Sequence, residues 1–274
     1  MPSPFIRLFE ARVIKACAAH VALFCLLLAV TVAGAAAADM LAAGAKNYKP
    51  YAVKQIGAAL AGGKDLQAAV KAGDVKAAQA AWIASRKGWE TAEPITGEFF
   101  PKLDETIDAW PDAKQGYHAI EAALFSGKLD EIKAPVDKLV ADLSAFNTRL
   151  SAPNFQFDPQ RLLNGATKLA YEIGESKSKG GESPYSGTSL IDIQQNIDGV
   201  EAVYKLVFHP SLMMRDPKLA ARIVDKIDDV QKLVKVTDMK SVDQPALKNA
   251  GEELAVLLQN SAAKLKLKKP AVGD

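Results

Sequence analysis

Apolar residues recur at intervals of three and four positions along most of the chain after residue 39. This spacing places them on one side of an α-helix, where they form a stripe that packs against other helices. Three such stripes consist of Val136, Leu139, Leu143, Phe146 and Leu150; of Leu190, Ile193, Ile197, Val200, Tyr204 and Val207; and of Leu219, Ile223, Ile227, Val230 and Val234. Strand-like alternation is almost absent. The pattern therefore predicts an all-α protein, built as a helical bundle.

Glycine and proline mark where these helices end. Gly73 followed by Asp74 predicts a helix stop and then an N-cap. The dipeptides at 209–210 (His-Pro) and 216–217 (Asp-Pro) predict a turn between two long helices.

The segment 154–159 is the best candidate for an internal joint, because prolines lie at or beside both of its ends. We expect a bundle of four-helix type on each side, over residues 39–152 and 158–274, packed together. One continuous bundle over 39–274 is the alternative. A polar loop is expected at residues 177–188, which include two adjacent glycines and a proline.

The first 38 residues have the three parts of a secretory signal. Arg7, Arg12 and Lys15 form a basic start, residues 16–32 are apolar apart from one histidine, and residues 33–38 are small. We expect this signal peptide to be cleaved and the remainder to reside in the periplasm. An uncleaved anchor is the alternative, although the strongly apolar part is shorter than the ~20 residues that span a bilayer. No stable membrane insertion is expected after cleavage.

Removing the signal changes the composition. The whole chain has 34 basic and 32 acidic side chains, and the signal takes three basic and one acidic, which leaves 31 of each. Both cysteines leave with it, and of three histidines only His118 and His209 remain. Without cysteine there is no disulfide framework, Cys-ligated metal site or thiol nucleophile. Equal numbers of basic and acidic side chains leave no excess of positive charge of the kind that binds nucleic acid.

Acidic residues and one histidine gather between residues 89 and 125: Glu90, Glu93, Glu98, Asp104, Glu105, Asp108, Asp112, His118 and Glu121. Residues three or four apart share a helix face. The resulting pairs are His118 with Glu121, Glu90 with Glu93, and Asp104 with Asp108. The helix around Glu121 is apolar nearly all round, and a buried carboxylate is costly unless it is paired or binds a cation. One imidazole with several carboxylates suits iron, manganese, calcium or zinc.

The same residues are compatible with simpler roles. His118 and Glu121 can form an ordinary hydrogen-bonded pair on a helix. The flanking acids can form a solvated face, balanced by the basic residues Arg86, Lys87, Lys102 and Lys114. Spacing alone therefore leaves a metal site as one hypothesis among these.

The segment from Gly116 to Glu121 matches the G-x-H-x-x-E signature of the imelysin-like (M75) family. The surrounding sequence resembles the M75 domain of EfeO and EfeM, periplasmic components of Efe-type iron uptake. Further likenesses occur, in order, at residues 70–74, 89–94, 103–108, 169–173, 185–188 and 196–199. The resemblance runs from about residue 45 to the end.

This resemblance implies an all-helical periplasmic protein that binds iron and delivers it to an inner-membrane iron permease. Zinc or calcium are alternative ions. The implied metal-binding residues are His118, Glu121, Glu90, Glu93, Asp104 and Glu172. The chain resembles the M75-only, EfeM-type form, because it is too short to include the cupredoxin domain of longer EfeO proteins.

The family name suggests a metallopeptidase as an alternative. Zinc peptidases with H-E-x-x-H or H-x-x-E-H place a second histidine next to the motif. Here Ala122 follows Glu121, and His209 is far away in the sequence. Local chemistry therefore favours metal binding without catalysis.

An anionic, alginate-like polysaccharide is the other alternative ligand. It would need a cleft lined by aromatic and basic side chains, for which the candidates are Trp82, Trp89, Trp110, Tyr117, Arg86 and Lys87. Tryptophans at helical spacing are also typical of a core.

Overall fold

The computed structural model describes residues 40–272, and no β-strand occurs among them. The predicted all-α class is confirmed. None of the helices in this part of the chain is long and apolar enough to cross a membrane. The predicted signal peptide lies outside the described residues.

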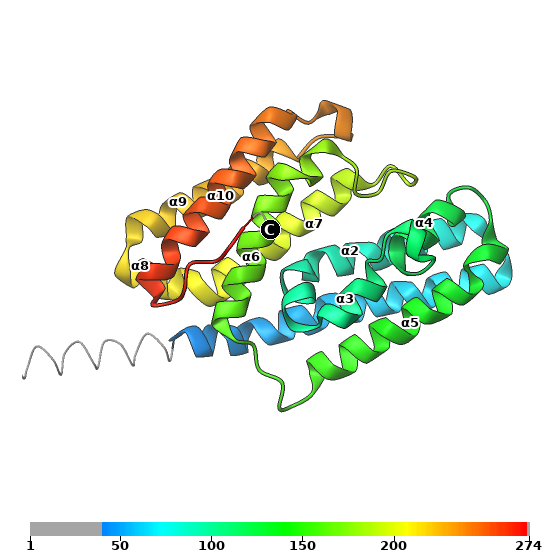
Figure 1. Ribbon diagram of the computed structural model, residues 1–274, viewed down its shortest axis with the longest axis horizontal. Helices are drawn as coiled ribbons and strands as arrows, with labels where there is room; N and C mark the ends of the chain where they lie inside the picture. The colour runs from blue at the N-terminus through cyan, green and yellow to red at the C-terminus, as the bar shows by residue number, and fades with distance from the viewer. Residues whose placement is uncertain (1–39, 273–274) are drawn as a thin grey trace, which may run out of the picture. The chain divides into compact units, whose positions relative to one another are not determined.

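The first described helix covers residues 40–72. After it come α2 (Val75–Phe99), α3 (Pro101–Ile107), α4 (Gly116–Leu124), α5 (Leu129–Ser151), α6 (Pro159–Glu175), α7 (Ser189–Val203), α8 (His209–Arg215), α9 (Pro217–Leu233) and α10 (Gln244–Leu265), as Figure 1 shows. Short helical turns are η1 (Pro111–Ala113), η2 (Lys177–Lys179), η3 (Tyr204–Phe208) and η4 (Met239–Ser241).

Aspartate side chains begin several of these helices. The carboxylates of Asp74, Asp158, Asp216 and Asp243 each accept a hydrogen bond from a backbone N–H in the first turn of α2, α6, α9 and α10. Such caps satisfy donors that have no partner within the helix. The predicted stop and cap at residues 73–74 are confirmed. A break between helices lies at the predicted joint, since α5 ends at Ser151 and α6 begins at Pro159.

The predicted turn between residues 209 and 217 is wrong. His209 begins a further helix, α8, which follows the π-helical turn η3 directly. Pro210 lies in the first turn of α8, where the absence of its N–H is tolerated. The N–H of His209 reaches back five residues to the carbonyl of Tyr204. The chain therefore continues as helix up to Asp216.

All three predicted apolar stripes are buried. The first stripe lies in α5, the second in α7 and η3, and the third in α9 and Val234, the residue after it. Residues 41–272 form one unit, in which α10 packs against α6 and α9, and α4 packs against α5. The division into sub-bundles over 39–152 and 158–274 stays a prediction.

Helices α6 and α7 both pack against α2 (Figure 1). Two glycines permit this approach. A Cβ atom on Gly165 would lie 1.9 Å from the carbonyl oxygen of Pro94, and one on Gly199 would lie 2.4 Å from that of Thr91. Pro94 lies inside α2 and has no N–H to bond the carbonyl of Glu90. The close approach brings acidic residues of α2 next to polar residues of α7.

Gly165→Ala is expected to lower the free energy of unfolding by about 3 kcal/mol, because the added methyl group must push α6 away from α2. Chemical denaturation measures the change. The matched control is Gly57→Ala, since a Cβ atom there meets nothing within 4 Å. That substitution is expected to stabilise the helix over residues 40–72 by about 0.5–1 kcal/mol. Equal effects of the two substitutions would contradict the packing described.

Candidate functional site

Helix α4 holds the two residues of the His-x-x-Glu motif in the interior. Nδ1 of His118 lies 3.9 Å from Oε2 of Glu121, and both side chains are buried. Oε1 of Glu121 accepts hydrogen bonds from the N–H of Tyr185 (3.1 Å) and from the N–H and Oγ of Ser186 (2.8 and 2.7 Å). Within the described chain, Nδ1 of His118 and Oε2 of Glu121 have no hydrogen-bond partner.

The other edge of the His118 ring faces Asp108. Nε2 lies 3.6 Å from Oδ1 of Asp108, and the ring stacks on Trp110 with centroids 4.5 Å apart and planes 6° apart. One ligand atom from each of Asp108, His118 and Glu182 lies within 4.8 Å of the other two. Two atoms bound to one metal ion lie ~3–4 Å apart, so small side-chain movements suffice for these three to share an ion.

Arg86 is the first of two buried cations in the site, with 1% of its side chain exposed. Its guanidinium lies 2.8 Å from Glu90 and 2.6 Å from Asp108, and 3.7–3.8 Å from Glu182 and Asp192. Burial by itself would raise the pKa of Asp108, but Arg86 lowers it below its usual range. Asp108 is therefore ionised and held between Arg86 and His118.

Lys177 is the second buried cation. Its Nζ lies 3.0 Å from Glu93 and 3.0 Å from Glu182. Asn196, on α7, donates to the side chains of Glu90 and Glu93 and also to the backbone carbonyl of Glu90. This hydrogen bond replaces the one that the backbone of residue 94 cannot donate to that carbonyl, because Pro94 has no N–H.

Negative charge exceeds positive charge around these two cations. Arg86 and Lys177 together contact five carboxylates, those of Glu90, Glu93, Asp108, Glu182 and Asp192. Burial raises the pKa of Asp192 to about 7, and it raises the pKa of Glu93 well above its usual range despite Lys177. This excess of negative charge favours uptake of protons, and it would also favour a further cation.

An acidic cleft of about 350 Å³ lies next to this cluster, between α2, α3 and α6. Its acidic lining residues are Glu93, Glu98, Asp104, Glu105, Asp108 and Glu172. Burial raises the pKa of Asp104 to about 6 and also raises the pKa of Glu172. Asp108 lines the cleft and contacts His118, so it joins the two parts of the site.

The sequence profile of the imelysin peptidase family (M75) matches residues 44–115 and 112–268. These segments cover most of the chain. The chain belongs to the imelysin family.

Among imelysin-family relatives, an Efem/EfeO family lipoprotein of Staphylococcus haemolyticus is 33% identical over 69% of this chain and 68% of its own length. The iron uptake system component EfeM of Pseudomonas syringae is 30% identical, with the same coverage. The iron uptake system component EfeO of Escherichia coli O157:H7 is 32% identical over 64% of this chain. The chain spans about half the length of that EfeO protein, 48%.

The fold has a solved counterpart. A crystallised protein from Parabacteroides distasonis, named as an iron-regulated protein A precursor, superposes with a TM-score of 0.69. The match covers 83% of this chain and 95% of the other at 16% sequence identity. The imelysin-family chain therefore shares that helical fold.

The structure separates the six predicted metal-binding residues into two groups. His118, Glu121 and Glu90 are fully enclosed, whereas Glu93, Asp104 and Glu172 line the acidic cleft. His118 lies beside Glu121, while Glu90 pairs with Arg86. The role of each of the six as a metal ligand stays a prediction.

Two residues beside His118 were not among the six. Asp108 had a signal in the sequence, because it lies four positions after Asp104 on the same predicted face. Glu182 had none, because it comes from the loop between η2 and α7, where no periodicity places a side chain.

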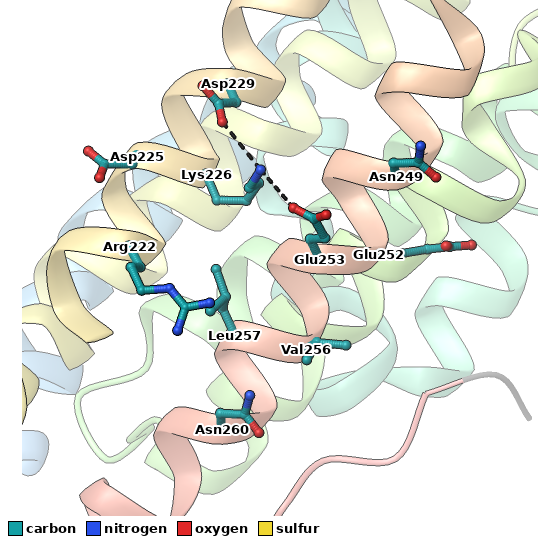
Figure 2. A pocket seen from close by; sticks show the side chains of 10 residues that line it. All are labelled: Arg222, Asp225, Lys226, Asp229, Asn249, Glu252, Glu253, Val256, Leu257 and Asn260. Carbon is teal, nitrogen blue, oxygen red and sulfur yellow. Dashed lines mark ion pairs between the residues drawn. The ribbon is translucent and has the colours of Figure 1, made fainter. Parts of the chain in front are cut away.

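A different hollow lies between α9 and α10. Figure 2 shows this groove of about 750 Å³, in which Lys226 pairs with Asp229 (3.3 Å) and Glu253 (2.8 Å). It contains none of the predicted metal-binding residues. None of the three residues grouped at His118 lines it, so the groove is separate from that site.

The polysaccharide cleft expected as an alternative does not form from the suggested aromatic residues. Trp82, Trp89 and Tyr117 are fully buried, and Trp82 donates from Nε1 to the carbonyl of Tyr117. They fix α4 on α2 as part of the core. Trp110 alone of the four is exposed, at 55%.

Proposed function

We propose that this imelysin-family protein is an extracytoplasmic iron-binding component of an iron-uptake system. It is exported through the signal predicted at residues 1–38, and it passes its iron to an inner-membrane permease. Relatives at 30–33% identity that are named as EfeM or EfeO family proteins support this role. The iron is cargo and is bound without catalysis.

The observation that carries the proposal is the buried polar environment of His118. A nitrogen of His118 and an oxygen of Glu121 face each other at 3.9 Å without hydrogen-bond partners among residues 40–272. Asp108 lies 3.6 Å from the other ring nitrogen, Nε2, and Glu182 forms a grouping with Asp108 and His118. Burying excess carboxylates beside an unsatisfied imidazole is costly, and a bound cation offsets the negative charge. We therefore place the iron at His118, with Asp108 and Glu182 as its carboxylate partners. Glu121 faces the opposite edge of the ring, and with a metal on Nε2 the protonated Nδ1 can donate to it, which orients the imidazole.

The acidic cleft supplies the route to this position. Glu93, Asp104 and Glu172 line it, and clustered negative charge raises the local concentration of cations. Asp108 is at the inner end of the route, because it borders both the cleft and His118. Carboxylates with one imidazole are hard ligands that suit iron.

Titration of the exported protein with ferrous iron under anaerobic conditions, and with ferric, zinc and calcium ions, tests the proposal. Calorimetry should give one iron site per protein molecule. Tryptophan fluorescence should change as well, because Trp110 stacks on His118. Metal analysis of protein purified from the periplasm identifies the ion bound in the cell. Absence of binding by every ion would refute the proposed function.

Cation affinity is expected to rise with pH between pH 5 and pH 7. Asp104 has a pKa of about 6, so below that pH it is protonated and neutral, and above it the carboxylate attracts a cation. Titration with Mn²⁺ at several pH values measures the trend. Asp104→Asn should flatten part of the pH dependence. A rise of the same size in both proteins would show that Asp104 plays no part.

A further inference from the structure

The ammonium group of Lys177 lies among three carboxylates in the interior of the site. Nζ is 3.0 and 3.1 Å from the two oxygens of Glu93 and 3.0 Å from Oε1 of Glu182. Oε2 of Glu90 is 3.8 Å away. The lysine side chain is only 4% exposed. Carboxylate oxygens thus surround Nζ as they would surround a bound metal cation.

Lys177 stays charged in this position. Burial by itself would lower the pKa of Lys177, but the carboxylates of Glu93 and Glu182 raise it above its usual range. A buried ammonium group has lost its water shell, and only close, well-placed carboxylates compensate for that loss. The lysine therefore neutralises Glu182, which is a proposed partner of the cargo ion, together with Glu90 and Glu93 beside it.

Lys177 lies in the connection between two long helices. Lys177 extends from the short turn η2, between α6 and α7, and not from either long helix. The loop that follows carries Glu182 and Ser186, which also contact the site. A change in this connection does not require α6 or α7 to move.

We propose that Lys177 is a tethered cation that pairs with Glu90, Glu93 and Glu182 in the cargo-free protein and is displaced when iron binds. This inference rests on the proposed function as an iron carrier. Displacing Nζ from its carboxylates opposes binding, and its return favours release. The lysine thereby keeps the affinity low enough for iron to be passed on.

A purely structural role for Lys177 makes the opposite prediction. If the lysine only holds the carboxylates in place, its removal should disorder them and weaken cation binding. If it competes with the cargo, its removal should tighten binding. The direction of the change therefore separates the two roles.

Lys177→Met is expected to tighten binding of Mn²⁺ and Fe²⁺ by about 10-fold or more, because it removes a positive charge from within ~4 Å of the carboxylates. Lys177→Arg keeps the charge and should bind close to wild type. The charge-matched control is Lys128→Met: Lys128 pairs with Glu131 at 3.4 Å, is 57% exposed and lies outside the site and the acidic cleft. That control should change affinity by less than about 3-fold. Unchanged or weaker binding by folded Lys177→Met would overturn the proposal.

Amine labelling of the wild-type protein gives a second measurement that needs no variant. Acetylation by an N-hydroxysuccinimide ester, followed by peptide mass spectrometry, reports the exposure of each lysine. Lys177 should be protected without metal and should react several-fold faster with Mn²⁺ bound, while the exposed Lys128 serves as the internal reference. Continued protection of Lys177 in the Mn²⁺-saturated protein would overturn the proposal. Failure of the wild-type protein to bind any cation would instead refute the proposed function, and this inference with it.

Discussion

His118→Ala is expected to weaken iron binding by at least about 100-fold. His118 supplies the imidazole in the one grouping of potential ligands found among the described residues, together with Asp108 and Glu182. Loss of a residue that merely orients a metal ligand typically costs about 10–100-fold in affinity, so loss of a ligand should cost no less. Calorimetric or fluorescence titration with Fe²⁺ measures the change.

The control for this substitution is His209→Ala. His209 begins α8 and contacts the ring of Tyr204 at a centroid distance of 5.5 Å. It is not part of the grouping at His118. Its removal should leave iron affinity unchanged within error. If His118→Ala binds iron as the wild-type protein does, the site assignment is wrong even though the protein binds iron.

Arg86→Met is expected to lower the free energy of unfolding by about 3–5 kcal/mol at neutral pH. Methionine fills much of the same volume but leaves Glu90, Asp108 and Asp192 without the guanidinium that they contact. An uncompensated buried carboxylate is strongly destabilising. Urea denaturation of the metal-free protein measures the loss.

The loss should become smaller as the pH falls. Burial raises the pKa of Asp192 to about 7 even beside Arg86. Without the guanidinium, Asp192 takes up a proton more readily. Less unpaired negative charge is therefore buried at pH 5 than at pH 8. Arg222→Met is the matched control, because Arg222 is exposed at the groove in Figure 2. It should change stability by less than about 0.5 kcal/mol. Similar losses for both variants would show that the Arg86 ion pairs contribute little to stability.

The helices could be predicted because their signals are local. Every residue of the stripe from Val136 to Leu150 is buried in α5, since a period near 3.6 puts these residues on one side whatever the neighbouring helix is. The helix end at Gly73 and the cap at Asp74 depend on two adjacent residues. The continuation of helix through Pro210 was missed, because a π-helical turn before it accommodates a residue that usually ends a helix.

One part of the site, the pair on α4, could also be predicted from a local signal. His118 and Glu121 lie three positions apart on one helix, so helix geometry alone brings them together. Lys177 and Glu93 are 84 residues apart, and they meet because α6 and α7 pack against α2. No periodic signal marks Glu182 or Lys177, since both come from the connection between these helices.

By itself, the sequence determined the all-α class, the buried stripes and the pairing of His118 with Glu121, because all three depend on residues within a few helical turns of each other. Only the tertiary structure decided which carboxylates surround His118 and which cations already neutralise them. Those contacts join α2, α3, α4 and the loop before α7, and they depend on close helix packing at Gly165 and Gly199. Long-range packing of this kind has no local sequence pattern, yet it determines the charge that a cargo ion meets.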